Sequence, residues 1–389
     1  MSQGRVLVAM SGGVDSSVAA GLLHEAGYEV VGVTMKTWDY ETSLGGSGAS
    51  RTQSGCCSLD DMNDARAVAV RLGAAHAVVD IRAEFGGWVI DRFARDYAEG
   101  RTPNPCVLCN THIKWAALLK RADALGCEHI ATGHYARVRA EAGRHVVSRG
   151  LDRDKDQSYV LWGVAQEHLA RTLFPLGGYS KAEIRQMATE MGFEHVAAKK
   201  DSYEICFVPD DDYRGFLRRR EPRLAALGGG PFVWSETGET VGRHEGYPFY
   251  TVGQRRGLGV ALGEPAYVVR IEPATNTVVL GPRSALASHA LEARGVVWGK
   301  ADGIEGEARL LGQIRHRDAG GAATVRQTGP DALDAVFETP RLAVAPGQAA
   351  VFYDGDDVAA GGWIARPADA AGASAPPEAD ADFLPLPTL

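Results

Sequence analysis

The sequence predicts an α/β protein with an N-terminal parallel sheet and a C-terminal part rich in short strands. Apolar strand patterns alternate with helical patterns through about the first 200 residues, as in a parallel sheet with helices on both faces. Near residue 210 the pattern changes to a basic helix followed by Gly-rich segments and short strands. From Leu291 onward, short strands are split by Gly, Asp and Pro, which is typical of a small barrel.

The first strand and helix are joined by the run SGGVDSS at residues 11–17. The apolar run 6–10 predicts a buried strand, and the apolar positions of 18–26 fall at helical spacing before a stop at Gly27. Glycines let backbone approach a ligand closely, and the N–H groups of a helix N-terminus favour an anion. No lysine follows the glycines, so the Walker pattern is not met.

Further alternation follows this loop. Ser58 and Ser180 are each followed three residues later by an acidic residue, so each is expected to cap a helix. We expect a loop at 41–55 and a Pro-rich loop at 101–110. The other expected helices and strands of this part are strands 29–35, 77–81 and 128–133, and helices 85–98 and 112–125. Ligands in such sheets bind beyond the carboxyl ends of the strands, where the 11–17 loop lies.

In the second half, residues 210–223 predict a basic helix. Short strands are expected at 231–234, 247–252, 267–272 and 277–280. The Ala-, Pro- and Asp-rich tail at 367–389 is expected to be disordered.

Composition restricts the class of protein. The chain has 389 residues with 45% hydrophobic and 23% charged residues, which is typical of a globular protein of two or three domains. No apolar run reaches 18 residues and no signal-peptide pattern is present, so no membrane association is expected and a cytoplasmic location is predicted. The net charge of −8 argues against a general nucleic-acid coat but allows a local basic face.

Six cysteines fit thiol chemistry in a reducing compartment. Cys106 and Cys109 follow a loop framed by prolines and precede a helix, whose dipole favours a thiolate. Cys206 follows Lys199 and Lys200, whose charges would lower its pKa, while burial beside its apolar neighbours Ile205 and Phe207 would raise it. A Cys-x-x-Cys pair supplies two of the four ligands that zinc needs, so a zinc site is incomplete without partners.

Several motifs, together and in order, resemble the bacterial tRNA-specific 2-thiouridylases, the MnmA family. The motifs are SGGVDSS, TPNPxxxCN, ATGHY at 131–135, GLDxxKDQSY at 150–159, KKDSxxICF, TxGQRxGLG at 251–259 and PGQ at 346–348. The first of them also resembles the pyrophosphate loop of N-type ATP pyrophosphatases. The similarity runs from about residue 4 to residue 364.

The resemblance implies a three-domain organisation and an activity. It implies an ATP pyrophosphatase domain at 1–209, a central tRNA-contacting domain at 210–284 and a β-barrel at 285–366. The implied reaction is ATP-dependent transfer of persulfide sulfur to C2 of the wobble uridine, position 34, in tRNAs for Lys, Glu and Gln. A cysteine desulfurase or sulfur-relay protein would supply the sulfur.

The resemblance also assigns roles to individual residues. Cys109 matches the nucleophile and Cys206 the persulfide carrier. The implied ATP-binding residues, of which Asp15 would also hold phosphate-bound Mg²⁺, are Ala9, Met10, Ser11, Gly12, Gly13, Val14, Asp15, Ser16, Met35 and Gly133. The implied contacts with the target base or with other parts of the tRNA are Asn104, Pro105, Cys106, His134, Lys155, Asp156, Gln157, Arg315, His316 and Gln348.

One position departs from the family. Many members have Asp where this chain has Cys106, and a thiol has a higher unperturbed pKa, ~8.5 against ~3.9. Either the acid–base role of that Asp is dispensable or Cys106 does something else. Cys106, Cys109 and Cys206 would also suffice for an iron–sulfur cluster with an open site, which is the less favoured reading. Cys56 and Cys57 have no assigned role.

The implied mechanism begins with attack of the uridine C2 oxygen on the α-phosphate of ATP. Sulfur then reaches C2 by direct attack of the Cys206 persulfide, or as hydrosulfide released by Cys109. Two alternatives remain. An ATP-dependent amide ligase would need a glutaminase domain or partner and no Cys206. A non-catalytic tRNA-binding protein would leave the intact SGGVDSS run unexplained.

Overall fold

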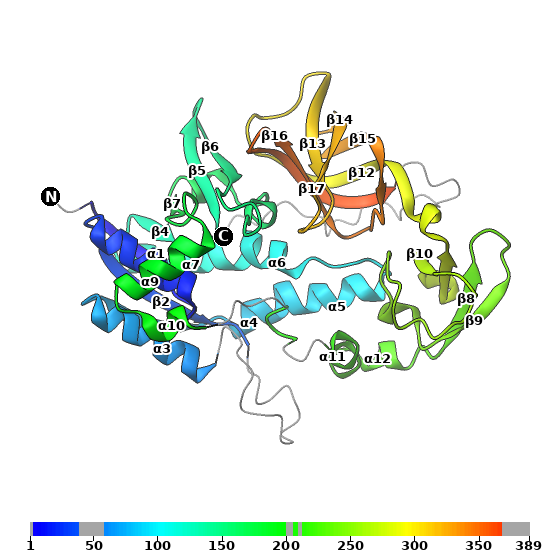
Figure 1. The fold of residues 1–389 in the computed structure, drawn as a ribbon, viewed down its shortest axis with the longest axis horizontal. Coiled ribbons are helices and arrows are strands. Elements are labelled where there is room, and N and C mark those ends of the chain that lie inside the picture. Colours follow the sequence, from blue (N-terminus) through cyan, green and yellow to red (C-terminus); the bar gives the residue numbers. More distant parts are fainter. Residues whose placement is uncertain (1–2, 39–57, 200–204, 209–211, 368–389) are drawn as a thin grey trace. The chain divides into compact units, whose positions relative to one another are not determined.

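The structure is a computed structural model that describes residues 3–38, 58–199, 205–208 and 212–367. These residues group into two compact units (Figure 1). Unit 1 contains Met1–Ile90 and Cys106–Asp212, and unit 2 contains Asp91–Pro105 and Tyr213–Leu389, in each case for the part described. The predicted loop at 41–55, Cys56 and Cys57 lie outside the described residues.

Unit 1 is built on a parallel sheet with strand order β3-β2-β1-β4-β7. The strands are β1 (Arg5–Ala9), β2 (Glu29–Lys36), β3 (Ala75–Asp80), β4 (His129–Ala131) and β7 (Thr172–Leu173). The central strand β1 is fully apolar in its middle, where Val6, Leu7 and Val8 have no exposed surface. Such a strand must be covered on both faces. The predicted parallel sheet is confirmed.

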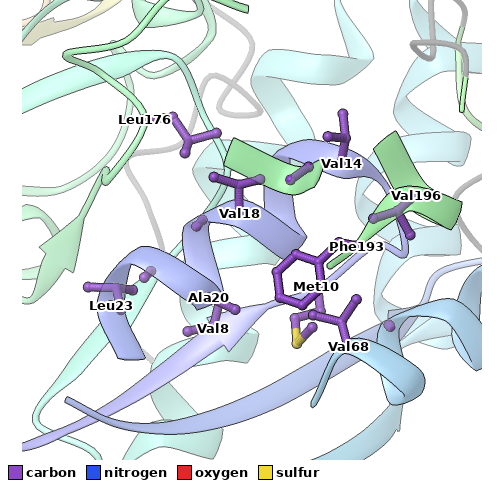
Figure 2. Close-up of a cluster of buried hydrophobic side chains, with 14 of the residues drawn as sticks. Val8, Met10, Val14, Val18, Ala20, Leu23, Val68, Leu176, Phe193 and Val196 are labelled. Carbon is purple, nitrogen blue, oxygen red and sulfur yellow. The ribbon is translucent and has the colours of Figure 1, made fainter. Parts of the chain in front are cut away.

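Helices cover both faces of this sheet. One face carries α1 (Val14–Glu25), α3 (Leu59–Arg71), α9 (Lys181–Glu190) and α10 (Glu194–Ala197). Figure 2 shows side chains of β1, of these helices and of the residues next to them pointing into a single apolar cluster, among them Val8, Met10, Val18, Val68, Phe193 and Val196. Helix α7 (Trp115–Ala124) packs against β1 and β4 and adds no side chain to that cluster, so it covers the other face.

Both predicted helix caps are confirmed. The Ser58 hydroxyl accepts the Asp61 N–H at the start of α3. Ser180 and Glu183 form a reciprocal capping box at the start of α9. Each cap satisfies backbone donors that the helix itself leaves unpaired.

The predicted loop at 101–110 is wrong in its second half. A helical segment already begins at Pro105, as α6 (Pro105–Leu108), the π-helical η2 (Cys109–Lys114) and then α7. Proline is tolerated in a first turn because its missing N–H has no helical partner there. The predicted helix 85–98 is likewise divided, into α4 (Arg82–Phe85), the π-helical η1 (Gly86–Ile90) and α5 (Asp91–Ala98).

Unit 1 also contains elements that the sequence did not predict. A hairpin is formed by β5 (Ala136–Glu141) and β6 (Arg144–Arg149), which pair antiparallel. Short helical turns follow it at η3 (Ser158–Val160) and α8 (Gln166–Leu169).

The first part of unit 2 combines the helices α5 and α11 (Tyr213–Arg220) with a small sheet. The ring of Phe93 in α5 packs on the ring of Phe216 in α11, with centroids 6.0 Å apart. The sheet has the order β10-β11-β8-β9. Its strands are β8 (Gly230–Trp234), β9 (Thr240–His244), β10 (Tyr267–Glu272) and β11 (Thr277–Gly281). The predicted strand 247–252 is wrong, because Tyr247–Phe249 is a 3₁₀ turn with Pro248 inside it.

The second part of unit 2 is a closed barrel, as predicted. Neighbouring strands follow the order β12-β15-β14-β13-β16-β17, and β12 also pairs with β17, which closes the ring. The strands are β12 (Ala287–Trp298), β13 (Glu307–Gln313), β14 (Gly321–Gly329), β15 (Ala332–Leu342), β16 (Ala349–Asp354) and β17 (Asp357–Pro367). Pro367 ends β17, so the predicted tail starts within a strand, and 368–389 lie outside the described residues.

Within the described ranges, every helix is too short or too polar to cross a membrane.

Candidate functional site

The candidate site lies at the point where the strand order in the sheet of unit 1 reverses, between β1 and β4. Strand β1 pairs with β2 on one side and with β4 on the other, so the chain leaves β1 and β4 toward opposite sides. In open parallel sheets the crevice beyond the strand ends at such a point binds ligands. The loop after β1 and the loop after β4 meet here. A Cβ added to Gly133 would lie 2.8 Å from the Ser16 nitrogen.

The glycine loop is shaped to receive an anion. Gly12 has φ +75°, and a Cβ there would lie 2.1 Å from the Asp61 carbonyl oxygen, so only glycine fits. Gly13 is the N-cap of α1, and no side chain caps that helix. The hydroxyls of Ser16 and Ser17 instead donate to the Gly13 carbonyl, at 3.2 and 2.9 Å. The start of α1 can therefore offer N–H groups to a phosphate.

Asp15, in the first turn of α1, is held by two donors. The Tyr135 hydroxyl donates to Asp15 Oδ1 at 2.7 Å, and Lys181 Nζ lies 2.7 and 2.8 Å from the two carboxylate oxygens. The Asp15 side chain remains 34% exposed, whereas that of Lys181 is 12% exposed. A carboxylate in this position can turn to a cation carried by a bound nucleotide.

Tyr135 is fixed in turn by the predicted tRNA-contacting segment 155–157. Its N–H donates to Gln157 Oε1 at 3.0 Å, and its carbonyl accepts the Gln157 N–H at 2.9 Å. Asp156 accepts from the N–H groups of Gly150 and Ser158, and the Lys155 N–H donates to the Asp152 carbonyl. Asp156 and Gln157 thus order their own loop, and their tRNA contacts stay predictions.

Lys199 links the glycine loop to helix α3. Its ammonium donates to the Gly12 carbonyl at 3.0 Å and to Asp61 Oδ1 at 2.7 Å, and it also pairs with Asp64. Burial lowers the pKa of Lys199, but hydrogen bonds to the two carboxylates outweigh burial and the net shift is upward. The charge of Lys199 is thus directed at these two carboxylates, and its effect on the pKa of Cys206 stays a prediction.

Met10 and Met35 differ in what they can offer a nucleotide. The Met10 side chain is 2% exposed and belongs to the apolar cluster of Figure 2. Its backbone is fixed, because its N–H donates to the Val33 carbonyl and its carbonyl accepts the Thr34 hydroxyl. Met35 lies near the carboxyl end of β2 and is half-buried. A side-chain contact with adenosine is therefore available to Met35 and not to Met10.

The two predicted catalytic cysteines lie on segments that share α4 as a neighbour. Cys109 is buried and begins η2, and η2 contacts α4. Cys206 is exposed, and the next residue, Phe207, packs its ring on Phe85 of α4 with centroids 5.8 Å apart. Cys106 is exposed in α6. Across the described ranges, no three His, Cys, Asp or Glu side chains gather in a way that could hold a metal ion.

His134, a predicted tRNA contact, is buried inside unit 1. Burial, and secondarily the charge of Lys114, lowers its pKa well below the usual value. Its Nδ1 lies 2.7 Å from the Thr132 hydroxyl, and its ring packs against both Trp115 and Phe174. The structure thus gives His134 a packing role, and its tRNA contact stays a prediction.

In unit 2, the PGQ turn of the barrel holds the segment that leads to Asn104 and Pro105. The Gln348 amide donates to the carbonyls of Thr102 and Pro103 at 3.2 and 2.9 Å. The Thr102 N–H donates to the Pro346 carbonyl at 2.8 Å. Gly347 has φ +87°, and a Cβ there would lie 2.9 Å from the Thr102 carbonyl oxygen. Gln348, a predicted tRNA contact, therefore fixes the predicted base-contacting segment.

Arg315 and His316 form an exposed turn of the barrel. The buried Gln313 side chain shapes this turn by donating to the carbonyls of both residues, at 3.1 and 2.9 Å. Arg315 Nη1 donates to the Leu342 carbonyl at 3.2 Å. An exposed guanidinium can bind a phosphate, and the tRNA contacts of Arg315 and His316 stay predictions.

Five residues around the glycine loop were not predicted as parts of the candidate site: Tyr135, Lys181, Lys199, Asp61 and Asp64. Tyr135 belongs to the ATGHY motif, which is the only signal that could have pointed to it. Lys181 sits directly after the Ser180 cap, and nothing in its sequence context marks it as part of a site.

Three family models match the chain. They are the tRNA methyl transferase HUP domain over residues 4–210, the tRNA methyl transferase PRC-barrel domain over 217–282 and the aminomethyltransferase β-barrel domain over 288–364. Together they span both the candidate site and the barrel.

Full-length relatives match as well. The chain is 58% identical over 365 residues to a tRNA-specific 2-thiouridylase MnmA of Salinibacter ruber, covering 93% of this chain and 94% of the relative. It is 56% identical over 364 residues to the MnmA of Cytophaga hutchinsonii, covering 93% and 97%.

Proposed function

Because the chain belongs to the family of tRNA-specific 2-thiouridylases, enzymes of ATP-dependent tRNA 2-thiolation, we propose that it activates the C2 oxygen of the wobble uridine as an adenylate. The observation that carries this proposal is the uncapped start of α1 behind a glycine loop, at the switch point of a parallel sheet. The same loop is the phosphate-binding element of the proposed reaction.

In the first step, the uridine C2 oxygen attacks the α-phosphate of ATP and pyrophosphate leaves. The loop from Ser11 to Ser16 would surround the phosphates, while Met35 and Gly133 would border the adenosine. The carboxylate of Asp15 fits a cation that ATP itself carries, because Mg²⁺ is usually bound by one or two carboxylates plus substrate phosphates. When bound, Mg²⁺ would neutralise developing phosphate charge.

In the second step, sulfur replaces the adenylated oxygen. A persulfide on Cys206 attacks C2 and expels AMP, which leaves uridine C2 joined to Cys206 through two sulfur atoms. The Cys109 thiolate then attacks the Cys206 sulfur, releasing 2-thiouridine and forming a Cys109–Cys206 disulfide. In the other route, Cys109 attacks the persulfide first and frees hydrosulfide, which attacks C2. Both routes oxidise the two thiols, so an external thiol must reduce them.

The exposure of the two thiols supports Cys206 as the persulfide carrier and Cys109 as the thiolate that attacks it. Cys206 is exposed, so a cysteine desulfurase or sulfur-relay protein can load it. Cys109 is buried at the start of a π-helix, where solvent thiols reach it less easily. We further propose that the substrates are tRNAs for Lys, Glu and Gln and that the protein acts in the cytoplasm.

The experiment that tests this function separates adenylation from sulfur transfer. Cys206→Ser should still form AMP and pyrophosphate in a tRNA-dependent manner, yet yield no 2-thiouridine, because a hydroxyl cannot carry sulfane sulfur. Cys109→Ser should accumulate persulfide on Cys206. Cys127→Ser is the matched control for loss of a thiol, because Cys127 is a free cysteine with no role in the proposed reaction. Peptide mapping reads the Cys109–Cys206 disulfide in wild-type enzyme after one turnover without reductant.

Two results would contradict the proposal. Multiple-turnover thiolation by Cys206→Ser with persulfide as the sulfur source would remove Cys206 from the mechanism. Iron bound in anaerobically purified wild-type protein and lost together with activity in Cys106→Ser would favour a cluster held by the three thiols instead.

A further inference from the structure

Lys181 holds the carboxylate that the proposed function assigns to the cation of ATP. Its Nζ lies 2.7 and 2.8 Å from the two oxygens of Asp15. From this geometry we infer that Lys181 is a nucleotide-binding residue, which neutralises Asp15 before ATP binds and contacts a phosphate oxygen afterwards. The inference rests on the proposed nucleotide site at the start of α1.

The backbone of Lys181 is fixed at the beginning of α9. The Ser180–Glu183 capping box orders the first turn of that helix, and the Lys181 N–H donates to Asp152 Oδ2 at 2.9 Å. The side chain extends from there toward the start of α1, with its ammonium 5.8 Å from the centre of the Tyr135 ring. The Lys181 side chain is 12% exposed, so little rotamer freedom is left to lose when a ligand binds.

Comparison with Lys199 indicates why Lys181 is the cation that can change partners. Lys199 lies between two carboxylates, Asp61 and Asp64, and also binds the Gly12 carbonyl. A bound cation at Asp15 leaves those contacts intact, so Lys199 keeps its supporting role. Lys181 instead shares Asp15 with the incoming cation.

The exchange is balanced in charge. In the protein without nucleotide, Lys181 and Asp15 form an ion pair with no net charge next to the glycine loop. When the Asp15 carboxylate turns to Mg²⁺, the positive charge of the Lys181 ammonium is no longer balanced by Asp15, which lies in the first turn of α1. Phosphate oxygens are the groups that such a combination of lysine and helix N-terminus binds. The Tyr135 hydroxyl also donates to Asp15 Oδ1, so the carboxylate has a second donor beside Lys181.

The test measures nucleotide affinity rather than turnover. Equilibrium dialysis of full-length protein gives Kd for ATP and for adenosine, each with Mg²⁺ and with EDTA. Lys181→Met keeps the apolar stem and removes the charge, and Lys120→Met, an exposed lysine on α7, is the matched control. Losing one charge-assisted hydrogen bond should weaken ATP binding with Mg²⁺ by about 10- to 100-fold. Adenosine binding should not change.

The EDTA arm distinguishes this exchange from a simple attraction between lysine and ATP. Without Mg²⁺, Lys181 stays in its ion pair with Asp15 and does not turn to a phosphate. Lys181→Met should therefore weaken ATP binding far less than it does with Mg²⁺. In wild-type protein, Mg²⁺-ATP should slow acylation of Lys181 by an amine reagent, read by peptide mass spectrometry, whereas adenosine should not.

Three results would overturn the inference. These are an unchanged Kd for Mg²⁺-ATP in Lys181→Met, an equal loss for ATP and adenosine, and equal acylation of wild-type Lys181 with either ligand. The acylation arm needs no variant, so it decides the matter even if Lys181→Met fails to fold. Failure of the proposed function would look different, because wild-type protein itself would then bind no ATP or form no AMP with tRNA.

Discussion

His134 shows at the scale of one residue how burial decides protonation. Its pKa lies well below the usual value because the ring is buried. In the unfolded chain the pKa returns to about 6.5. Below that pH the imidazole binds a proton in the unfolded state but stays neutral in the folded state. The free energy of unfolding should therefore fall as pH drops from about 6.5 toward the folded-state pKa.

Urea unfolding of wild-type protein and His134→Gln at pH 7.5 and 5.5 measures this effect. Wild type should lose more free energy of unfolding than the variant, by up to about 1.4 kcal/mol for each pH unit below 6.5. His76, His168 and His244 also have lowered pKa values, but they are present in both proteins and cancel in the comparison. Parallel losses in the two proteins would show that His134 titrates normally.

Single residues were predictable where a motif marks them. Asp15 stands in a run of seven residues whose strand–loop–helix context is confirmed. Lys181 and Lys199 were missed as site residues because their partners are remote in sequence. The Lys181–Asp15 contact spans 166 positions and the Lys199–Asp61 contact 138. No local pattern encodes such a pairing, since it arises only when the sheet places the loops together.

At the scale of elements, the helix caps and most of the expected strands were predictable, whereas one expected strand is a turn and two π-helical turns were not predicted. The Ser58 and Ser180 caps were predictable because capping depends on residues within one turn. The run 247–252 is rich in aromatic residues and favours a strand by propensity, yet tertiary packing of the buried Tyr247–Phe249 turn prevails. The π-helical turns at Gly86–Ile90 and Cys109–Lys114 leave no signal in hydrophobic periodicity.

The barrel turn that contains Gln348 offers a prediction about one segment. Gln348→Ala removes both hydrogen bonds to the carbonyls of Thr102 and Pro103. Without tRNA, amide hydrogen exchange in peptides covering 101–105 should therefore become faster, and KM for tRNA should rise while Kd for ATP stays unchanged. Weaker tRNA binding with unchanged exchange would show instead that Gln348 acts by touching the tRNA directly. Gln327→Ala, in β14, is the matched control for an amide elsewhere in the barrel.

At the scale of the whole molecule, a net charge of −8 must be reconciled with binding of a polyanion. The charge is unevenly placed. In the exposed turn of Arg315, His316 and Arg317, the neighbouring acid Asp318 is paired with Arg341 and is itself buried. That pairing leaves the turn locally positive within an acidic protein. Affinity for tRNA is then expected to come from a few such places rather than from overall charge.

Arg315→Ala tests this account through the salt dependence of tRNA binding. If the guanidinium neutralises one phosphate, the variant should bind tRNA more weakly and its plot of log Kd against log salt should flatten by roughly one unit. The matched control is Arg309→Ala, because Arg309 is an exposed arginine of β13 in the same barrel but pairs with Glu338. It should leave the slope unchanged. An unchanged slope in Arg315→Ala would mean that this turn faces solvent in the complex, and equal flattening in both variants would mean that tRNA affinity follows net charge after all.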